Sequence, residues 1–290
     1  MLVRPGAVVR DAGWAVEVKW DGARACVAIG RGVVQVRSRH RTDLTARLPE
    51  LGALGEDLAA RSVVLDGELV VLDERDGHPD FERLRRRLPL TPARAARGAV
   101  RDPVRLVAFD VLCLDGEDLR DRSYDERRAV LDQLGLSEPA LVPESFCSAS
   151  HDLAAATARL GLEGVVYKRR ASRYRAGRRS ADWIKVKHRR LSRLEVTAWQ
   201  PGGDGQPEEL LLAARQRDGR RRHVGRVQFG LDRDRRRVLA RALAAYELPR
   251  RGRRGAVRDV APGIEVDVAH HGDRGVLRDP VIRDVIIAER

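Results

Sequence analysis

Short apolar segments with strand-like patterns recur through the first two thirds of the chain. Residues 15–18 alternate between apolar and polar positions and end at Lys19, which the turn-forming pair Asp21-Gly22 follows. Two apolar segments around Gly30-Arg31-Gly32 predict a β-hairpin. The full set of strands expected in this part covers residues 15–18, 25–29, 33–36, 63–72, 104–112, 164–168 and 183–187.

Helical patterns lie between these strands. Ser123 with Glu126 three residues later forms a capping box, and Gly135 ends that helix. Ser150 is expected to cap a helix that stops near Gly161. Residues 81–88 predict a short helix and residues 44–58 a weak one, whereas residues 1–13 and 91–103 are expected to be irregular. Because strands and helices do not alternate regularly, we expect an α+β domain with largely antiparallel sheets and flanking helices.

The pattern changes near residue 190. Short strands are expected at residues 194–199, 210–215, 222–228 and 264–270, with one helix at residues 231–246. A small barrel of short strands with one helix, rich in arginine, is typical of an oligonucleotide-binding (OB) fold. We therefore expect two domains, at residues 1–189 and 190–290.

The charge composition of the chain indicates which class of partner it would bind. The 290 residues carry a net charge of +13 with a pI near 10.7, and arginine runs occur at residues 220–222 and 250–254. This balance favours a polyanion, with nucleic acid as the first candidate. No apolar segment reaches membrane-spanning length and the N-terminus has no signal core, so we expect no membrane partner and a cytoplasmic location. The three cysteines Cys26, Cys113 and Cys147 are far apart in apolar surroundings and are interpreted as reduced core residues.

Lysine is rare in this chain. Among 56 basic residues, lysine occurs only at positions 19, 168, 185 and 187. Arginine stays charged, whereas lysine can lose its proton and act as a nucleophile. A chain that uses arginine almost everywhere and keeps four lysines invites the hypothesis that an amine is needed; the alternative is that four lysines survived a compositional drift.

The lysines lie in a series of short motifs. Lys19, Asp21, Gly22 and Arg24 form K-x-D-G-x-R, a match that alone is only suggestive. The later motifs are Ser38-Arg39, Asp66-Gly67-Glu68-Leu69, Phe109-Asp110-Val111-Leu112, Glu163-Gly164-Val165-Val166-Tyr167-Lys168 and Trp183-Ile184-Lys185-Val186-Lys187. In this order and at this spacing, nearly the whole chain resembles the covalent nucleotidyltransferases. Within them it resembles the compact bacterial ATP-dependent DNA ligases related to the ligase module of end-joining repair proteins.

The resemblance implies a role for each motif residue. Lys19 would attack the α-phosphate of ATP and hold AMP through a P–N bond. An ammonium cannot attack, and nearby cations such as Lys185 and Lys187 would favour the neutral amine. The remaining expected contacts are Glu17 to adenine, Phe109 stacked on the purine, Arg24 and Arg39 at the ribose and phosphate, Glu68 at the ribose or metal, Glu163 at the metal and Arg179 at the triphosphate. Glu68 and Glu163 would hold Mg²⁺ or Mn²⁺, since paired carboxylates suit a hard cation.

The resemblance extends to the C-terminal stretch, where Arg278, Arg283 and Asp284 match a motif that closes the barrel over ATP. Val285 departs from the lysine that related enzymes often have there. Only 18 residues precede Lys19, too few for the helical DNA-binding domain of larger ligases. We therefore expect nicked duplex DNA to be held by the arginine-rich barrel and by residues 169–179, in a monomer of the nucleoid that a repair protein recruits.

Other interpretations stay open at this point. An RNA ligase or a capping enzyme shares the K-x-D-G chemistry, and the nucleotide that labels Lys19 would separate them. An NAD-dependent ligase is disfavoured, because the chain has no zinc-binding cysteine set. A non-catalytic nucleic-acid-binding protein is a further alternative, opposed by the intact set of Lys19, Glu68, Glu163, Lys185 and Lys187. Taken alone, Phe109 would be a core residue, and Asp66-Gly67 would be a hairpin turn.

Overall fold

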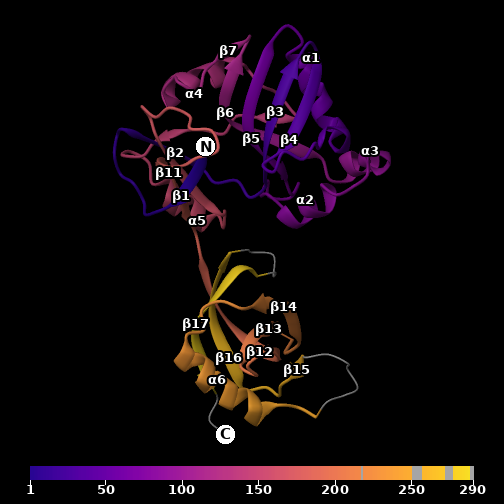
Figure 1. Ribbon diagram of the computed structural model, residues 1–290, viewed down its shortest axis with the longest axis vertical. Helices are drawn as coiled ribbons and strands as arrows, with labels where there is room; N and C mark the ends of the chain where they lie inside the picture. Colours follow the sequence, from indigo (N-terminus) through magenta and orange to yellow (C-terminus); the bar gives the residue numbers. More distant parts are fainter. Residues whose placement is uncertain (217, 250–256, 272–276, 288–290) are drawn as a thin grey trace. The chain divides into compact units, whose positions relative to one another are not determined.

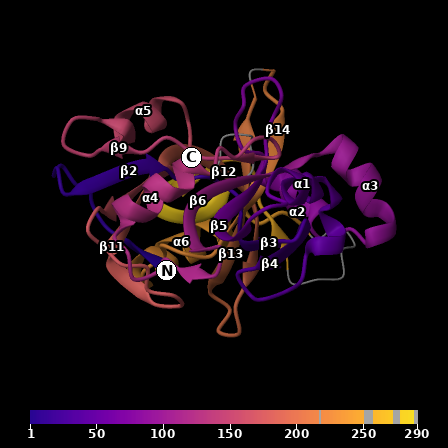
Figure 2. The ribbon, with the colours of Figure 1, turned by 90° about the horizontal axis from the view of Figure 1, so that it is seen from above.

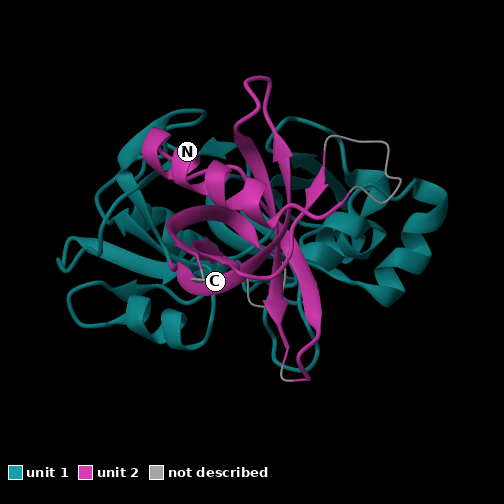
Figure 3. Cartoon of the chain, turned by 90° about the horizontal axis from the view of Figure 1, so that it is seen from below, with its two compact units in different colours: residues 1–187 teal, residues 188–290 magenta. Residues whose placement is uncertain are grey.

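The computed structural model describes residues 1–216, 218–249, 257–271 and 277–287. The arginine run at residues 250–254 lies outside the described residues. The chain divides into two compact units, Met1–Lys187 and His188–Arg290 (Figure 3).

Unit 1 contains two sheets with helices around them (Figure 1). The first sheet has the order β1-β11-β10-β2-β9 and the second β4-β3-β5-β6-β7, with β8 beside β6. The strands are β1 Leu2–Pro5, β2 Trp14–Val18, β3 Ala23–Gly30, β4 Val33–Ser38, β5 Ser62–Val71, β6 Val104–Leu114, β7 Glu117–Asp118, β8 Ala140–Leu141, β9 Phe146–Cys147, β10 Gly164–Arg169 and β11 Arg179–Lys187. All pairs are antiparallel except β1 with β11 and β6 with β8. The α+β expectation with largely antiparallel sheets is confirmed.

The helices of unit 1 pack against interior strands of the sheets, α2 against β5, α4 against β6 and α5 against β10. Figure 2 shows α2 and α3 at one side of this unit and α5 at the other. They are η1 Thr45–Arg47, η2 Pro49–Gly52, α1 Ala53–Asp57, α2 Phe81–Arg87, α3 Pro92–Arg101, α4 Tyr124–Gln133 and α5 Leu153–Arg159. The capping box at α4 is confirmed, since Ser123 accepts from the Glu126 amide and the Glu126 carboxylate accepts from the Ser123 amide. The weak helix expected at residues 44–58 is divided into η1, η2 and α1.

Three local expectations are wrong. Residues 1–13 are not wholly irregular, because β1 pairs in parallel with β11, a partner distant in the sequence. Residues 91–103 hold helix α3, since proline at its first position and alanine and arginine after it favour a helix. The cap of α5 is Asp152, whose side chain accepts from the Ala155 amide, and not Ser150.

The interpretation of the cysteines as core residues is also wrong. Cys26 is exposed, and Cys113 and Cys147 are half-buried. Cys26 lies on β3 between the buried Ala25 and Val27, so its side chain points to the opposite face of the strand. All three thiols are free.

Unit 2 is built on one antiparallel sheet with the order β14-β13-β12-β16-β17, and β15 pairs with β12. Its described elements are β12 Arg190–Pro201, β13 Pro207–Arg215, β14 Arg221–Val227, α6 Arg233–Tyr246, β15 Arg258–Asp259, β16 Ile264–His271 and β17 Arg278–Ile287. Leu239 and Leu243 of α6 pack with Val266 and Val268 of β16 in a core of this unit. None of the described helices is long and apolar enough to cross a membrane.

Candidate active site

A cavity of about 460 Å³ in unit 1 is lined by both sheets. All four lysines of the chain line it. The other lining residues that sequence analysis singled out are Glu17, Arg24, Arg39, Glu68, Phe109, Arg179 and Trp183. The shared location of the lysines argues against a random survival of four lysines in an arginine-rich chain.

Two motif glycines allow the strands around Lys19 to approach closely. A Cβ atom on Gly22 would lie 2.1 Å from the Leu69 carbonyl oxygen, and one on Gly164 would lie 2.1 Å from the Val186 carbonyl oxygen. Gly164 also has φ of 153°, a value that side chains disfavour. The Lys19 amide donates to the Gly164 carbonyl at 2.9 Å. The K-x-D-G and E-G motifs therefore meet at the backbone and fix the position of Lys19.

The Lys19 amine lies against a carboxylate that it shares with a second lysine. Lys19 Nζ is 2.6 Å from Glu163 Oε2, and Lys187 Nζ is 3.1 Å from Glu163 Oε1. Lys185 lines the same cavity, and its pKa is lowered by burial and by the neighbouring Lys187 and Lys19. The three lysines outnumber the nearby carboxylates Glu163 and Glu68, and the resulting excess of positive charge suits a polyphosphate.

Lys168 differs from the other three lysines because it is almost fully buried and pairs with Glu17 instead of Glu163 or the open cavity. It is 2% exposed, and its Nζ donates to both oxygens of Glu17, at 2.9 and 2.8 Å, and to the Phe109 carbonyl at 2.9 Å. Glu17 is also 2% exposed and accepts from the Tyr124 hydroxyl at 2.5 Å. The sequence alone does not reveal this ion pair, because it depends on the pairing of β2 with β10. In that register Glu17 lies opposite Val166, and Lys168, two residues further along β10, points to the same face.

Phe109 and Arg24 form one wall of the cavity. The Phe109 ring is edge-on to Trp183 at 6.1 Å, and the Arg24 guanidinium lies 5.6 Å from its centroid. Arg24 itself is held by Asp66, with Nε 2.9 Å from Oδ1 and Nη2 2.5 Å from Oδ2. Phe109 is half-buried and lines the cavity, so it is not simply a core residue. Asp66-Gly67 lies inside β5 and is not a hairpin turn.

The remaining predicted residues of unit 1 lie at the rim or floor. Glu68 lines the cavity, and burial raises its pKa to about 7 despite the opposing charges of Lys19 and Arg24. Arg39 is exposed at the rim, and Arg179 donates to the Val3 carbonyl at 2.8 Å. The structure thus brings together every predicted site residue of unit 1. Arg283 is exposed on β17 of unit 2.

A family model described as the ATP dependent DNA ligase domain matches residues 7–187, more than half of the chain. The chain belongs to the ATP-dependent DNA ligase family. The matched residues coincide almost completely with unit 1, which holds the cavity.

DNA ligases that are longer than this chain contain a segment similar to it. The multifunctional non-homologous end joining protein LigD of Mycobacterium bovis is 39% identical over 235 residues, which are 80% of this chain and 29% of LigD. A probable DNA ligase of Streptomyces griseus is 37% identical over 97% of this chain and 57% of its own length. The chain thus spans between about a third and somewhat over half of the length of these relatives.

Solved ligase structures support the fold. Mycobacterial DNA ligase D complexed with ATP and MES is 33% identical, with a TM-score of 0.59 over 100% of this chain and 94% of that one. The ligase domain of Mycobacterium tuberculosis LigD is 32% identical, with a TM-score of 0.57 over 99% and 97% of the two chains. The α+β nucleotidyltransferase-type fold of this ligase-family chain is therefore confirmed.

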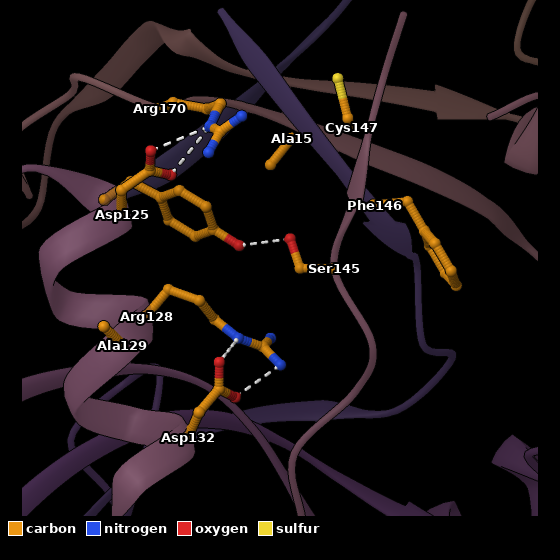
Figure 4. Close-up of a pocket in the computed structure, with 10 residues that line it drawn as sticks. Ala15, Asp125, Arg128, Ala129, Asp132, Ser145, Phe146, Cys147 and Arg170 are labelled. Atoms are coloured by element: carbon orange, nitrogen blue, oxygen red, sulfur yellow. Dashed lines mark hydrogen bonds and ion pairs between the residues drawn. The ribbon is translucent and has the colours of Figure 1, made fainter. Parts of the chain in front are cut away.

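This ligase-family chain has a second cavity in unit 1, of about 430 Å³, beside β2, β9 and α4 (Figure 4). Two ion pairs line it, Arg170 with Asp125 and Arg128 with Asp132. Tyr124 lines this second cavity while its hydroxyl reaches Glu17 of the first one. The two cavities therefore share a wall.

Proposed function

We propose that this chain is an ATP-dependent DNA ligase that seals nicks in duplex DNA through an AMP bound covalently to Lys19. The observation that carries the proposal is the position of the Lys19 amine, 2.6 Å from Glu163 in a cavity with Lys185, Lys187 and Phe109. The family match and the relatives' DNA ligase names favour this activity over the RNA ligase and capping alternatives.

The first step is nucleophilic attack at phosphorus. The Lys19 amine forms a P–N bond with the α-phosphorus of ATP, and the bond to the β-phosphate oxygen breaks as pyrophosphate leaves. The amine needs a free electron pair, and the Glu163 carboxylate is close enough to accept its proton. Lys185 and Lys187 would balance the negative charge on the transferring group.

The walls of the cavity suit a purine nucleotide. Phe109 would stack on the base, and Glu17 with its neighbouring backbone would contact the adenine edge. Arg24, Arg39 and Arg179 would face the ribose and phosphates from the wall and rim. The bidentate hold of Asp66 on Arg24 keeps its guanidinium in place without substrate.

The donor set also fits a divalent metal with few protein ligands. The described residues contain no group of three acidic, histidine or cysteine side chains that could hold a metal. Mg²⁺, however, is commonly bound by one or two carboxylates and by substrate phosphates. Glu68 and Glu163 are the carboxylates that would hold Mg²⁺ or Mn²⁺, which would polarise the phosphates. The backbone of Glu68 pairs within its sheet, whereas its carboxylate makes no hydrogen bond or ion pair within the described residues.

The two units would share the later steps. AMP would move from Lys19 to the 5′-phosphate of the nick, and the 3′-hydroxyl would then displace AMP. We propose residues 1–189 as the adenylation domain and residues 190–290 as an OB-fold domain, with Arg283 acting on ATP from the barrel. Arg39 and residues 169–179 would contact the nicked strand. A monomer in the nucleoid, recruited by a repair protein, would follow from a role like that in the names of the LigD relatives.

Mass spectrometry tests the proposal. The chain is first treated with pyrophosphate to remove any AMP it carries, and is then incubated with ATP and Mg²⁺. We expect the mass of one AMP to be added to the wild-type chain and none to Lys19→Ala. Lys19→Arg is the matched control, because it keeps the charge and removes the nucleophile, and it should also stay unmodified. A wild-type chain that gains no AMP would contradict the proposal, and labelling by GTP in preference to ATP would favour a capping-type enzyme.

A further inference from the structure

The buried network behind the nucleotide cavity begins on helix α4. Tyr124 is the first residue of α4, and the capping box of Ser123 and Glu126 fixes where this helix starts. Arg127 on the next turn is fully buried and makes a bidentate ion pair with Asp110 of β6, at 2.7 and 2.9 Å. α4 is therefore anchored to the strand that carries Phe109, and Tyr124 has a fixed position.

The direction of the hydrogen bonds follows from chemistry. A carboxylate can only accept, so the single Tyr124 proton goes to Glu17 Oε1. The Ser145 hydroxyl, 2.8 Å from the Tyr124 oxygen, must then donate to it. Burial and the neighbouring Glu17 raise the pKa of Tyr124 well above its usual value, so the hydroxyl keeps its proton.

The acceptors of Glu17 are nearly all used. Oε1 accepts from Tyr124 and Lys168, and Oε2 accepts from Lys168. Each carboxylate oxygen can accept about two hydrogen bonds, so the capacity that remains is on Oε2. Glu17 lines the nucleotide cavity, and the network therefore fixes which of its atoms can meet a donor there.

Lys168 connects the carboxylate to the aromatic wall. Its three protons go to the two Glu17 oxygens and to the Phe109 carbonyl, and its Nζ lies 4.9 Å from the Phe109 ring centroid. A displacement of Glu17 would therefore be transmitted to Phe109. Both groups that would contact the base depend on one buried ion pair.

We infer that Tyr124 is a positioning residue for nucleobase selection, acting through Glu17 from outside the nucleotide cavity. The inference rests on the proposed function, since it assigns the base-contacting wall of the same site. A 6-amino purine donates a hydrogen bond at the position where a 6-oxo purine presents an acceptor. A carboxylate oriented by Tyr124 and Lys168 favours the former and repels the latter.

The test compares Tyr124→Phe with wild type in lysyl-nucleotide formation from ATP and from GTP. The variant keeps the ring and removes only the hydroxyl. We expect KM for ATP to rise about tenfold, as for the loss of one hydrogen bond to a charged group. The preference for ATP over GTP should fall several-fold, while the rate at saturating ATP should stay within about threefold of wild type.

Tyr167→Phe is the matched control. Tyr167 is 3% exposed on β10, where it points to the opposite face of the strand from Lys168. Within the described residues its hydroxyl makes no hydrogen bond to Glu17 or Lys168, so KM and base preference should not change. In a Glu17→Gln background, Tyr124→Phe should add little, because Tyr124 acts through that carboxylate. If Tyr124→Phe does not fold, the base preference of Glu17→Gln alone is decisive.

The outcomes separate the inference from the proposed function. A wild-type chain that forms no lysyl-AMP would remove the proposed function. A wild-type chain that forms it, with a Tyr124→Phe chain of unchanged KM and base preference, would overturn only the inference. A lowered melting temperature with unchanged KM would likewise show a purely structural role for the hydroxyl and overturn it. Unchanged base preference in Glu17→Gln would have the same consequence.

Discussion

At the scale of single residues, Glu68 links the chemistry of the cavity to stability. Its pKa is raised to about 7 by burial, against an ordinary value of 4.5. The folded chain therefore binds more protons than the unfolded chain between these values, so the stabilising contribution is present at low pH and is lost as pH rises through 7. We expect Glu68→Gln to remove this dependence.

The measurement is the melting temperature from pH 5 to pH 8 in metal-free buffer. Relative to wild type, Glu68→Gln should gain stability as pH rises, by a few kcal/mol at most, since one pKa unit corresponds to about 1.4 kcal/mol. Glu144→Gln changes an exposed carboxyl and should follow the wild-type curve. A constant difference between Glu68→Gln and wild type across this range would contradict the expected burial effect.

Motif residues could be assigned to one site from the sequence, but their contacts could not. The order of the motifs was enough to group Lys19, Glu163, Lys185 and Lys187, which the structure brings together. The order of the motifs did not reveal that Lys168 forms a buried ion pair with Glu17, because that ion pair depends on which strands are neighbours. A motif gives the type of residue needed, and the sheet order decides what each one touches.

At the scale of elements, the glycine of K-x-D-G tests how closely the segment before β3 must approach the neighbouring strand β5. A side chain on Gly22 would meet the Leu69 carbonyl oxygen of β5 at 2.1 Å, and a backbone oxygen cannot rotate away. Gly22→Ala should therefore displace the segment after β2 and reduce lysyl-AMP formation by more than tenfold, with a lowered melting temperature. Gly52→Ala is the control, since nothing lies within 4 Å of its added Cβ atom, and it should be neutral. Normal AMP transfer to Gly22→Ala would refute this explanation of the motif.

Elements with local signals were predictable, and those that depend on distant partners were not. The hairpin of β3 and β4 and the capping box of α4 have their determinants within a few residues, and both were predicted. β1 exists because β11 pairs with it, more than 170 residues away. The α3 helix was missed for another reason: its buried positions are Ala95 and Gly98, which lack the large apolar side chains that mark a core-facing helix, although its alanines and arginines have high helix propensity.

At the scale of the whole molecule, the net charge of +13 implies that the proposed binding of DNA would rest largely on neutralisation of its phosphates. Affinity for a nicked duplex should fall linearly with salt on logarithmic axes, with a slope of about 0.9 per phosphate contact. Residues 169–179 are the expected contacts of unit 1. Within them Arg178 has no ion pair in the described chain, and Arg173 has only a long one of 3.7 Å to the exposed Asp121.

Replacing Arg173 and Arg178 by alanine should therefore reduce the magnitude of the slope by about 0.9 for each arginine that contacts a phosphate. Transfer of AMP to Lys19 should be unchanged, because ATP alone suffices for that step. Arg61→Ala is the control for lost charge. Arg61 pairs with Asp115, does not line the cavity, and precedes Glu68 by seven residues, which is about 20 Å along an extended strand. Fluorescence anisotropy with nicked DNA from 50 to 300 mM salt measures the slope. If Arg61→Ala changes it as much as the double variant does, net charge alone governs binding, and residues 169–179 do not form a specific contact surface.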